Sequence, residues 1–430
     1  MTIPVSITPD QAEAEALAAL DERTPVVLLT GRAGTGKSHF IRALVERDPG
    51  YPQALLAPTG LAAMNIGGQT VHSFFGFPPR PLIGLHEKPN WFFTRTARAL
   101  RRLIIDEVSM LRADVLDAMD QHLKVARKSS RPFGGVQMLL VGDFYQLPPV
   151  VRGDEGQLLE DAGYSSPYAF AAHALRDAPL AALELTEVRR QSDSDFIALL
   201  SALREQRGVV DAIATLNAEC LERALTQRPV LLCATNAVAD NYNVAGLEAL
   251  GGVAARYSGG FEGEAPKART DRYPAPIELI LKRGARVIFT QNDPEGRWVN
   301  GSLGTVKSLD ETVIVVALDG GEVVDVERAV WPQARWTWNA KENRMEVKEE
   351  FKYVQFPLAP AWALTIHKAQ GMTLDSVEID LGRGAFAPGQ TYVALSRARA
   401  IEGLRLARPL TPRDVRVDPA IAEGLARLGA

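Results

Sequence analysis

The chain has 430 residues, more than one hydrophobic core supports, and a prior of about one domain per 150 residues suggests roughly three domains. Hydrophobic residues make up 46% and charged residues 23%, a globular composition that excludes disordered, collagen-like and coiled-coil chains. The formal net charge of −4 lacks the basic excess of a simple nucleic-acid-binding domain, although a neutral total is compatible with a local basic groove.

Cysteine content and the amino-terminal sequence bear on the compartment. The two cysteines, Cys220 and Cys233, exclude a disulfide framework and indicate a reducing environment. No apolar run approaches the roughly 18 residues of a membrane span, and Met1–Gln11 lacks the features of a signal peptide. We therefore expect a cytoplasmic protein without a membrane partner. No group of histidines and cysteines has the spacing of a zinc site.

The first 150 residues repeat a short apolar run that ends in a small or polar residue. These runs are Val26–Thr30, Ala54–Ala57, Leu103–Ile105 and Met138–Val141. Helices are predicted at Ser38–Arg47 and Asp114–Arg127. Short buried runs that alternate with helices predict a parallel sheet covered on both faces, in which ligands collect beyond the carboxyl ends of the strands.

A second series of apolar runs follows. It comprises Val230–Cys233, Val354–Phe356, Val377–Leu381 and Leu404–Ala407. We also predict a helix around Trp362–Lys368. About Arg256–Glu350, short alternating runs and the turn Asp319–Gly321 predict a β-rich, barrel-like insertion, and Phe77–Arg98, with four prolines, predicts a smaller insertion in the first unit. The expected fold class is α/β, with two parallel-sheet units and one insertion in each.

The strongest motif is Gly31–Ser38 (GRAGTGKS), a full match to the P-loop pattern between a predicted strand and a predicted helix. Its glycines let backbone N–H groups surround phosphate oxygens, and the helix N-terminus adds a favourable dipole. We expect Lys37 to contact the β- and γ-phosphates of ATP and the Ser38 hydroxyl to bind Mg²⁺. The alternative is a glycine-rich turn without a ligand. The predicted nucleotide-binding residues of the loop are Gly31, Ala33, Gly34, Thr35, Gly36, Lys37 and Ser38.

Two further strand ends carry candidate catalytic residues. Asp106 and Glu107 follow Leu103–Ile105, where Asp106 suits Mg²⁺ coordination, through water, and Glu107 suits deprotonation of the attacking water. The alternative is a solvated strand end that precedes a helix, where acids are favourable anyway. Gln146, in Gly142–Val150, suits sensing of the γ-phosphate or positioning of the water, and a turn that merely ends the strand is about equally compatible with its spacing.

These motifs together resemble the superfamily-one DNA helicases, and most of all the petite integration frequency (PIF) family, with the RecD-like helicases next. The resemblance extends from Gln11 almost to the end of the sequence. The segments that carry it are Gly31–Ser38, Ala57–Ala63, Gly67–Phe75, Asp106–Met110, Arg131–Gln137, Gly142–Val150, Trp362–Thr373 and Gly389–Arg397. The implied fold is two RecA-like units, with a wedge insertion in the first and an SH3-like insertion in the second.

The resemblance implies roles that spacing cannot supply. Gln11 occupies the place of the glutamine that contacts adenine, and Arg397 that of the arginine finger. Arg190 resembles a second contact to the γ-phosphate, and Gln370-Gly371 is expected to couple the nucleotide to the strand-binding side. This chain has Arg189 where the family usually has an aromatic residue, which leaves open which of the two arginines faces the nucleotide.

The resemblance also implies a groove that holds single-stranded DNA mostly through its phosphates. The expected contacts are Thr59, Asn65, Thr70, His72, Ser73 and Phe74 from the first unit, and Thr365, His367 and Lys368 from the second. Trp91–Phe93 are candidate wedge residues at the fork, although aromatic side chains lie more often in a core.

The expected boundaries follow from the same resemblance. Residues 1–76 and 99–185 form the first motor domain, 77–98 the wedge insertion, 186–255 and 351–430 the second motor domain, and 256–350 the SH3-like insertion.

The implied function is an ATP- and Mg²⁺-dependent DNA helicase that moves 5′-to-3′ on single strands. It would unwind forked or tailed duplex, and extension to G-quadruplexes and RNA–DNA hybrids follows from the family. We expect a monomer in solution, in a bacterial or phage-like, nucleoid-associated setting. Two alternatives remain open: a RecD-like recombination or repair helicase or translocase subunit, and a nucleotide-switched binding module that does no work.

Overall fold

The computed structural model describes residues 9–84, 88–191, 193–225, 228–263, 273–339 and 344–429. The chain divides into two compact units. The first comprises Met1–Arg189, Ala334–Glu349 and Asp418–Ala430, and the second comprises Arg190–Gln333 and Glu350–Val417. None of the helices in the described ranges is long and apolar enough to cross a lipid bilayer.

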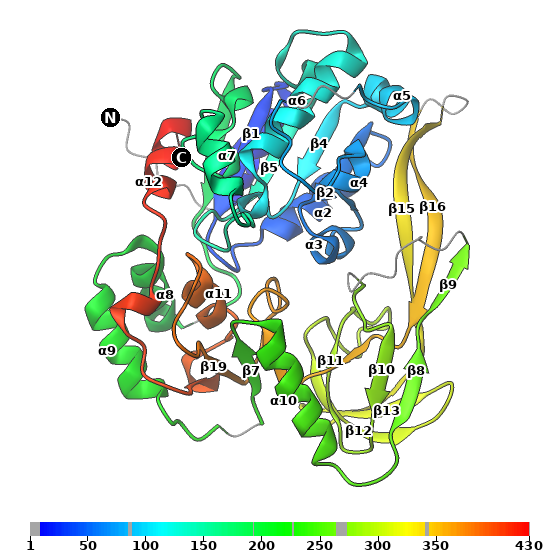
Figure 1. Cartoon of the computed structure of the whole chain (residues 1–430), viewed down its shortest axis with the longest axis vertical. Helices are drawn as coiled ribbons and strands as arrows, with labels where there is room; N and C mark the ends of the chain where they lie inside the picture. Colours follow the sequence, from blue (N-terminus) through cyan, green and yellow to red (C-terminus); the bar gives the residue numbers. More distant parts are fainter. Residues whose placement is uncertain are drawn as a thin grey trace. The chain divides into compact units, whose positions relative to one another are not determined.

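The first unit is built on a parallel sheet whose described strands have the order β3-β2-β4-β5-β1-β6 (Figure 1). The strands are β1 (Val26–Gly31), β2 (Gln53–Ala57), β3 (Gln69–Thr70), β4 (Arg102–Ile105), β5 (Gln137–Gly142) and β6 (Leu180–Leu185). Because neighbouring strands are parallel, their carboxyl ends lie along one edge of the sheet, where the predicted catalytic residues follow β1, β4 and β5. The four strands predicted in this unit are confirmed as β1, β2, β4 and β5.

One face of this sheet packs against helices from the first 65 residues. Val27 and Leu29 alternate along β1 with residues of the other face, and they join a core with Ala16 of α1 and Ile41 of α2. The helices of the unit are α1 (Pro9–Asp21), α2 (Lys37–Arg47), α3 (Gly60–Asn65), α4 (Val71–Phe75), α5 (Trp91–Ala99), α6 (Ala113–Arg127), α7 (Glu155–Asp161) and α12 (Ala420–Leu428).

The C-terminal helix α12 completes the first unit, although the preceding residues belong to the second. It packs against the short 3₁₀ helix Ala169–Ala171 and against β6. A Cβ atom at Gly424 would lie 2.4 Å from the ring of Phe170, so this helix position requires glycine. The sequence-based boundary assigned 351–430 to the second motor domain. Asp418–Ala430 instead group with the first unit because α12 buries its apolar residues there.

The second unit contains a smaller parallel sheet with the described order β18-β7-β19-β20. Its strands are β7 (Val230–Cys233), β18 (Ala363–Thr365), β19 (Val377–Asp380) and β20 (Leu404–Leu406), and its helices are α8 (Ser194–Glu205), α9 (Val209–Cys220), α10 (Asn236–Glu248) and α11 (Gln390–Leu395). The helix predicted around Trp362–Lys368 is wrong. Ala363–Thr365 form an edge strand because they pair with Leu231–Cys233 of β7 and are buried there.

The β-rich texture predicted for about Arg256–Glu350 is confirmed. A five-stranded antiparallel sheet has the order β14-β13-β12-β11-β17 and a core that includes Val287, Val316 and Phe356. Its strands are β11 (Arg286–Phe289), β12 (Leu303–Leu309), β13 (Ile314–Leu318), β14 (Val323–Val326) and β17 (Leu358–Pro360). Two smaller sheets contain β8 (Ala255–Ser258) with β10 (Glu278–Leu281), and β15 (Ala329–Asn339) with β16 (Arg344–Gln355) and β9 (Gly260–Gly263).

Candidate active site

The loop between β1 and α2 has the backbone shape of a phosphate cradle. Gly34 and Gly36 have φ angles of 84° and 96°, in the left-handed region that glycine adopts without strain. The Thr35 hydroxyl donates to the Arg32 carbonyl at 3.0 Å and braces the turn. A Cβ atom at Gly31 would lie 2.6 Å from the Leu185 carbonyl oxygen, so the loop packs directly on the end of β6. The peptide groups ahead of α2 are thus held in a conformation that suits phosphate binding.

Lys37 holds its ammonium group at this loop. Its Nζ donates to the carbonyl oxygens of Gly31 at 2.6 Å and Arg32 at 2.9 Å. A phosphate oxygen carries more negative charge than a carbonyl oxygen, so it competes well for these donors. The structure therefore places Lys37 where the P-loop motif predicts it.

Ser38 and Asp106 come together from different elements, the start of α2 and the end of β4. The Ser38 hydroxyl lies 3.5 Å from Asp106 Oδ2, and the Asp106 residue is 6% exposed. Burial raises the pKa of the Asp106 carboxyl, an effect that the Glu107 backbone N–H and the nearby Lys37 ammonium oppose. A bound cation would offset this desolvation, and Mg²⁺ accepts one or two protein oxygen ligands together with water and phosphates. The pair therefore fits the predicted magnesium site.

Glu107 adopts an unusual backbone conformation at the turn after β4. Its φ and ψ of 53° and 44° are left-handed, which costs free energy for a residue other than glycine, asparagine or aspartate. The neighbouring strand contributes to this turn. A Cβ atom at Gly142 would lie 2.8 Å from the Val108 backbone nitrogen, so β5 approaches the turn more closely than any side chain allows. The strained residue is the predicted general base.

Gln146 and Asp143 lie beyond the end of β5. Gln146 is 5% exposed, and its backbone N–H donates to the Asp143 carbonyl at 2.9 Å in a tight turn. Asp143 is fully buried and accepts a hydrogen bond from the Tyr145 backbone N–H at 3.2 Å. Sequence analysis did not single out Asp143. The available signal was its position, since it follows β5 much as Asp106 follows β4.

The consecutive arginines Arg189 and Arg190 belong to different units. The Arg189 backbone N–H donates to the Gly34 carbonyl at 2.8 Å, so this residue lies beside the phosphate loop. Arg190 donates to the carbonyls of Ser396 at 3.4 Å and Gly371 at 3.3 Å, within the second unit. The predicted adenine contact, Gln11, lies in the first turn of α1 and is exposed.

Arg397, the predicted arginine finger, is 1% exposed. Its guanidinium donates to the carbonyls of Val393 at 2.9 Å and Met372 at 3.3 Å, and to the Ser396 hydroxyl at 2.8 Å. These contacts all lie within the second unit. Transfer of this charge to a phosphate would require the carbonyl contacts to be exchanged. Of the predicted Gln370-Gly371 pair, Gln370 is half-buried and Gly371 is exposed with a left-handed φ of 83°.

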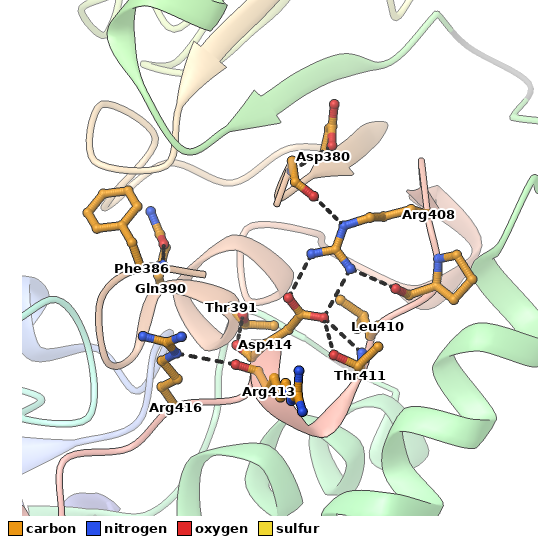
Figure 2. A network of polar contacts seen from close by, with 12 residues as sticks. Asp380, Phe386, Gln390, Thr391, Arg408, Leu410, Thr411, Arg413, Asp414 and Arg416 are labelled. Carbon is orange, nitrogen blue, oxygen red and sulfur yellow. Dashed lines mark hydrogen bonds and ion pairs between the residues drawn. The ribbon is translucent and has the colours of Figure 1, made fainter. Parts of the chain in front are cut away.

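A polar network holds helix α11, the element ahead of Arg397 (Figure 2). The Asp414 carboxylate accepts hydrogen bonds from Arg408 at 2.6 and 3.0 Å, and from the backbone N–H and hydroxyl of Thr411, both at 2.8 Å. The Thr391 hydroxyl of α11 donates to the Asp414 carbonyl at 2.5 Å. The Gln390 side-chain oxygen accepts from the Phe386 backbone N–H at 3.0 Å. The segment after β20 therefore fixes the amino end of α11.

The residues of the first unit that are predicted to contact single-stranded DNA lie within α3 and α4 or at their N-caps. The Thr59 and Thr70 hydroxyls cap these helices by accepting from the backbone N–H groups of Ala62 and Ser73. Asn65 and Ser73 are exposed, and Ser73 accepts from the Gln69 side-chain amide at 2.8 Å. His72 is half-buried, with its ring centroid 6.4 Å from that of Phe77.

Phe74 is a core residue, which corrects its assignment as a DNA contact. It is 6% exposed, and its ring packs edge-on against Phe75 and Phe93, at centroid distances of 5.3 and 5.8 Å. Phe93 is likewise buried, so of the three candidate wedge aromatics only Trp91 and Phe92, 65% and 64% exposed, are available at the surface.

The matching residues of the second unit follow β18. Thr365 is buried, and its hydroxyl accepts from the Lys368 backbone N–H at 3.3 Å. Burial lowers the pKa of the half-buried His367, so its imidazole is neutral at physiological pH. Lys368 is exposed and supplies the positive charge of this group.

The segment Arg131–Gln137 has a packing role. The Phe133 backbone N–H donates to Asp120 of α6 at 2.6 Å, and Arg127 donates to the Gly134 carbonyl at 2.8 Å. The Gln137 side-chain amide donates to the carbonyls of Leu20 and Thr24. This segment thus secures the start of β5, at the sheet edge opposite the phosphate loop.

Comparison with known proteins agrees with this geometry. Residues 7–207 match the family model described as PIF1-like helicase. The chain is 37% identical to the ATP-dependent DNA helicase PIF1 of Danio rerio over 88% of this chain and 58% of that protein. It is 33% identical to the ATP-dependent DNA helicase Pif1 of Bdellovibrio bacteriovorus over 97% of this chain and 91% of that protein.

Solved structures give the same result. A Bacteroides Pif1 in complex with ADP-AlF4 superposes with a TM-score of 0.88 at 32% identity, covering 98% of this chain and 96% of that chain. A Bacteroides Pif1 bound to single-stranded DNA gives 0.70 at 32% identity, covering 98% and 97%. These matches confirm the α/β fold with two parallel sheets and antiparallel insertions. The chain spans about three fifths of the zebrafish relative and nearly all of the bacterial one, and it belongs to the PIF1-like helicase family.

Proposed function

We propose that this chain is an ATP- and Mg²⁺-dependent DNA helicase that moves along single-stranded DNA in the 5′-to-3′ direction and unwinds duplex. The carrying observation is the convergence of Lys37, the Ser38–Asp106 pair and Glu107 at one edge of the first sheet. Family membership supports the activity, since relatives over most of this chain are ATP-dependent DNA helicases. The polarity rests on the family resemblance alone.

The chemistry of the first unit follows from its residues. The phosphate loop and Lys37 would bind the nucleotide phosphates, while Ser38 and Asp106 would hold Mg²⁺. Bound Mg²⁺ would supply neutralisation of the charge that develops on the phosphate oxygens. Glu107 would orient the attacking water and accept its proton, and Gln146 would sense the γ-phosphate. The γ-phosphate roles of Arg190 and Arg397 rest on the family resemblance.

DNA binding would use short polar groups that serve any sequence. Asn65 and Ser73 of the first unit and Lys368 of the second are exposed and suit phosphate contacts. Trp91 and Phe92 would stack on bases or separate a pair at the fork, since exposed aromatic faces accept any base. We propose a forked or tailed duplex as the substrate, because a solved Pif1 structure similar to this chain concerns DNA unwinding at forked double-stranded DNA, and a Bacteroides Pif1 has been crystallised bound to single-stranded DNA.

A first experiment measures ATP hydrolysis with and without single-stranded DNA, and then unwinding of 5′-tailed and 3′-tailed duplexes. We expect strong stimulation by DNA and unwinding of the 5′-tailed substrate. Absence of stimulation would refute the motor function, and preference for 3′ tails would refute the polarity.

A second experiment changes Glu107 to Gln, which keeps the shape of the side chain and removes the base. We expect hydrolysis to fall by about 10²–10⁴-fold while binding of ATP and DNA persists. The matched control is Glu15→Gln on α1, an exposed carboxylate of the same unit. Turnover of the Glu107 variant near that of the control would contradict the assigned role.

A further inference from the structure

Arg189 occupies a place beside the phosphate loop that the motifs do not explain. Its backbone N–H is anchored to the Gly34 carbonyl at 2.8 Å. Its guanidinium lies against the loop, because a Cβ atom built at Gly36 would be 3.5 Å from Nη1 and 3.8 Å from Cζ of Arg189. Gly36 is itself a predicted phosphate-binding residue and directly precedes Lys37. The positive charge of Arg189 therefore lies beside the part of the loop that is predicted to bind phosphate.

The guanidinium is held there by a weak partner. Arg189 Nη2 lies 3.4 Å from Glu13 Oε1 of α1, and the two side chains are 40% and 23% exposed. An ion pair of this length and exposure contributes little, since solvent screens it and two long side chains must be ordered. Glu13 therefore orients the guanidinium toward the loop without binding it tightly.

We propose that Arg189 is a nucleotide-binding residue of the first unit, whose guanidinium leaves Glu13 and donates to the phosphate chain of the bound nucleotide. The planar fork of arginine donors matches the geometry of phosphate oxygens, and a phosphate chain with several charges is a better partner than one carboxylate. Arg189 thereby acts as a binding residue that raises nucleotide affinity. The proposal rests on the proposed ATP-dependent function.

The neighbouring Arg190 does not share this placement. It donates to the Gly371 and Ser396 carbonyls of the second unit. The division between the units falls between these two arginines. Arg189 therefore serves the site of the first unit whatever position the second unit takes.

The test is equilibrium titration of the full chain with ATP, ADP and AMP in the absence of DNA. Arg189→Ala should weaken binding of ATP and ADP about tenfold or more, since a charge-assisted hydrogen bond is lost, and should affect AMP less. Arg189→Lys should restore part of the affinity because it keeps the charge. The matched control is Arg101→Ala, an exposed arginine next to the amino end of β4, which should bind as the unaltered chain does.

The outcomes separate the possible failures. Unaltered chain that binds no ATP would overturn the proposed function itself. ATP binding by Arg189→Ala within twofold of the unaltered chain would overturn the role of Arg189, and so would an equal loss for AMP and ATP. Glu13→Gln should keep or raise ATP affinity, because the amide competes less for the guanidinium. A tenfold loss in this variant would show that the ion pair only maintains structure, and would overturn the proposal.

Discussion

Asp106 in the first unit and Asp414 in the second are both buried carboxylates, yet their surroundings shift their pKa values in opposite directions. Burial raises the pKa of Asp106, whose carboxylate accepts from the Glu107 backbone N–H and lies 3.5 Å from the Ser38 hydroxyl. Asp414 accepts two hydrogen bonds from Arg408 and two from Thr411, which lower its pKa to about 2 despite burial (Figure 2).

The difference in pKa separates a predicted cation-binding site, at Asp106, from a polar network that stabilises the fold, at Asp414. A buried acid is stable when charged donors satisfy it, as Asp414 is, and costly when they do not. Asp106 retains a desolvation cost, and it lies at the edge of the sheet where Lys37 and the phosphate loop also lie. The Glu107 backbone N–H and the Lys37 ammonium offset this desolvation in part, and a bound cation would offset it further, which is why a perturbed pKa at such a position indicates function.

Among the variants that test this contrast between the two acids, Asp106→Asn should have the largest effect, on ATP hydrolysis. Asp106 is proposed to hold Mg²⁺ through water, and loss of such an outer-shell partner of a metal ion lowers activity by about 10–100-fold, so hydrolysis should fall by about that factor. The free energy of unfolding should stay equal or rise, because a desolvated charge is removed. Steady-state ATPase assays and urea unfolding measure the two quantities. A large loss of stability with normal hydrolysis would reverse the roles assigned to the two acids.

Asp414→Asn should show the opposite pattern. Removal of the charge takes away the carboxylate that accepts two hydrogen bonds from Arg408, so the free energy of unfolding should fall by about 2 kcal/mol. The chemistry at the phosphate loop is unaffected, so nucleotide affinity measured without DNA should change by less than twofold. Urea unfolding and nucleotide titration check both statements. Full stability of this variant would show that the Asp414 carboxylate does not stabilise the network of Figure 2.

The pH dependence of stability gives the smallest and finest test. The folded pKa of Asp414 lies below its unfolded value, so its contribution is complete above about pH 4 and is lost as pH falls toward 2. Asp106 has a raised folded pKa, so stability declines as pH rises above about 4 through that value. Urea unfolding between pH 3 and pH 7 without nucleotide should lose its acid-side slope in Asp414→Asn and its alkaline-side decline in Asp106→Asn. Unchanged profiles in both variants would contradict the assigned environments.

Much of the fold was predictable because the strands of the first sheet are marked by a local pattern in the sequence. Short apolar runs that end at polar residues gave β1, β2, β4 and β5 almost to the residue. The segment Ala363–Thr365 misled prediction, since three residues next to helix-compatible neighbours do not show that they pair with β7. Pairing between residues 132 positions apart, such as Ala363 and Leu231, is a tertiary effect that no local pattern carries.

The site was predictable where glycine sets the backbone geometry, as at Gly36, and where lysine supplies the charge, as at Lys37. Phe74 could not be placed, because an aromatic side chain at this spacing suits a groove and a core equally, and only its contact with Phe93 decides. The role of Arg189 could not be assigned either. Its position depends on the return of β6 beside the phosphate loop, which the sequence does not display.

The contact between Gly424 and Phe170 has a consequence for synthesis of the protein. Phe170 leaves the ribosome about 250 residues before the helix that covers it, and the whole second unit is made in between. At about 5–20 residues per second, the apolar surface around Phe170 stays uncovered for tens of seconds. The nascent first unit, with its phosphate loop already present, must therefore remain soluble in an incomplete form until its last helix arrives.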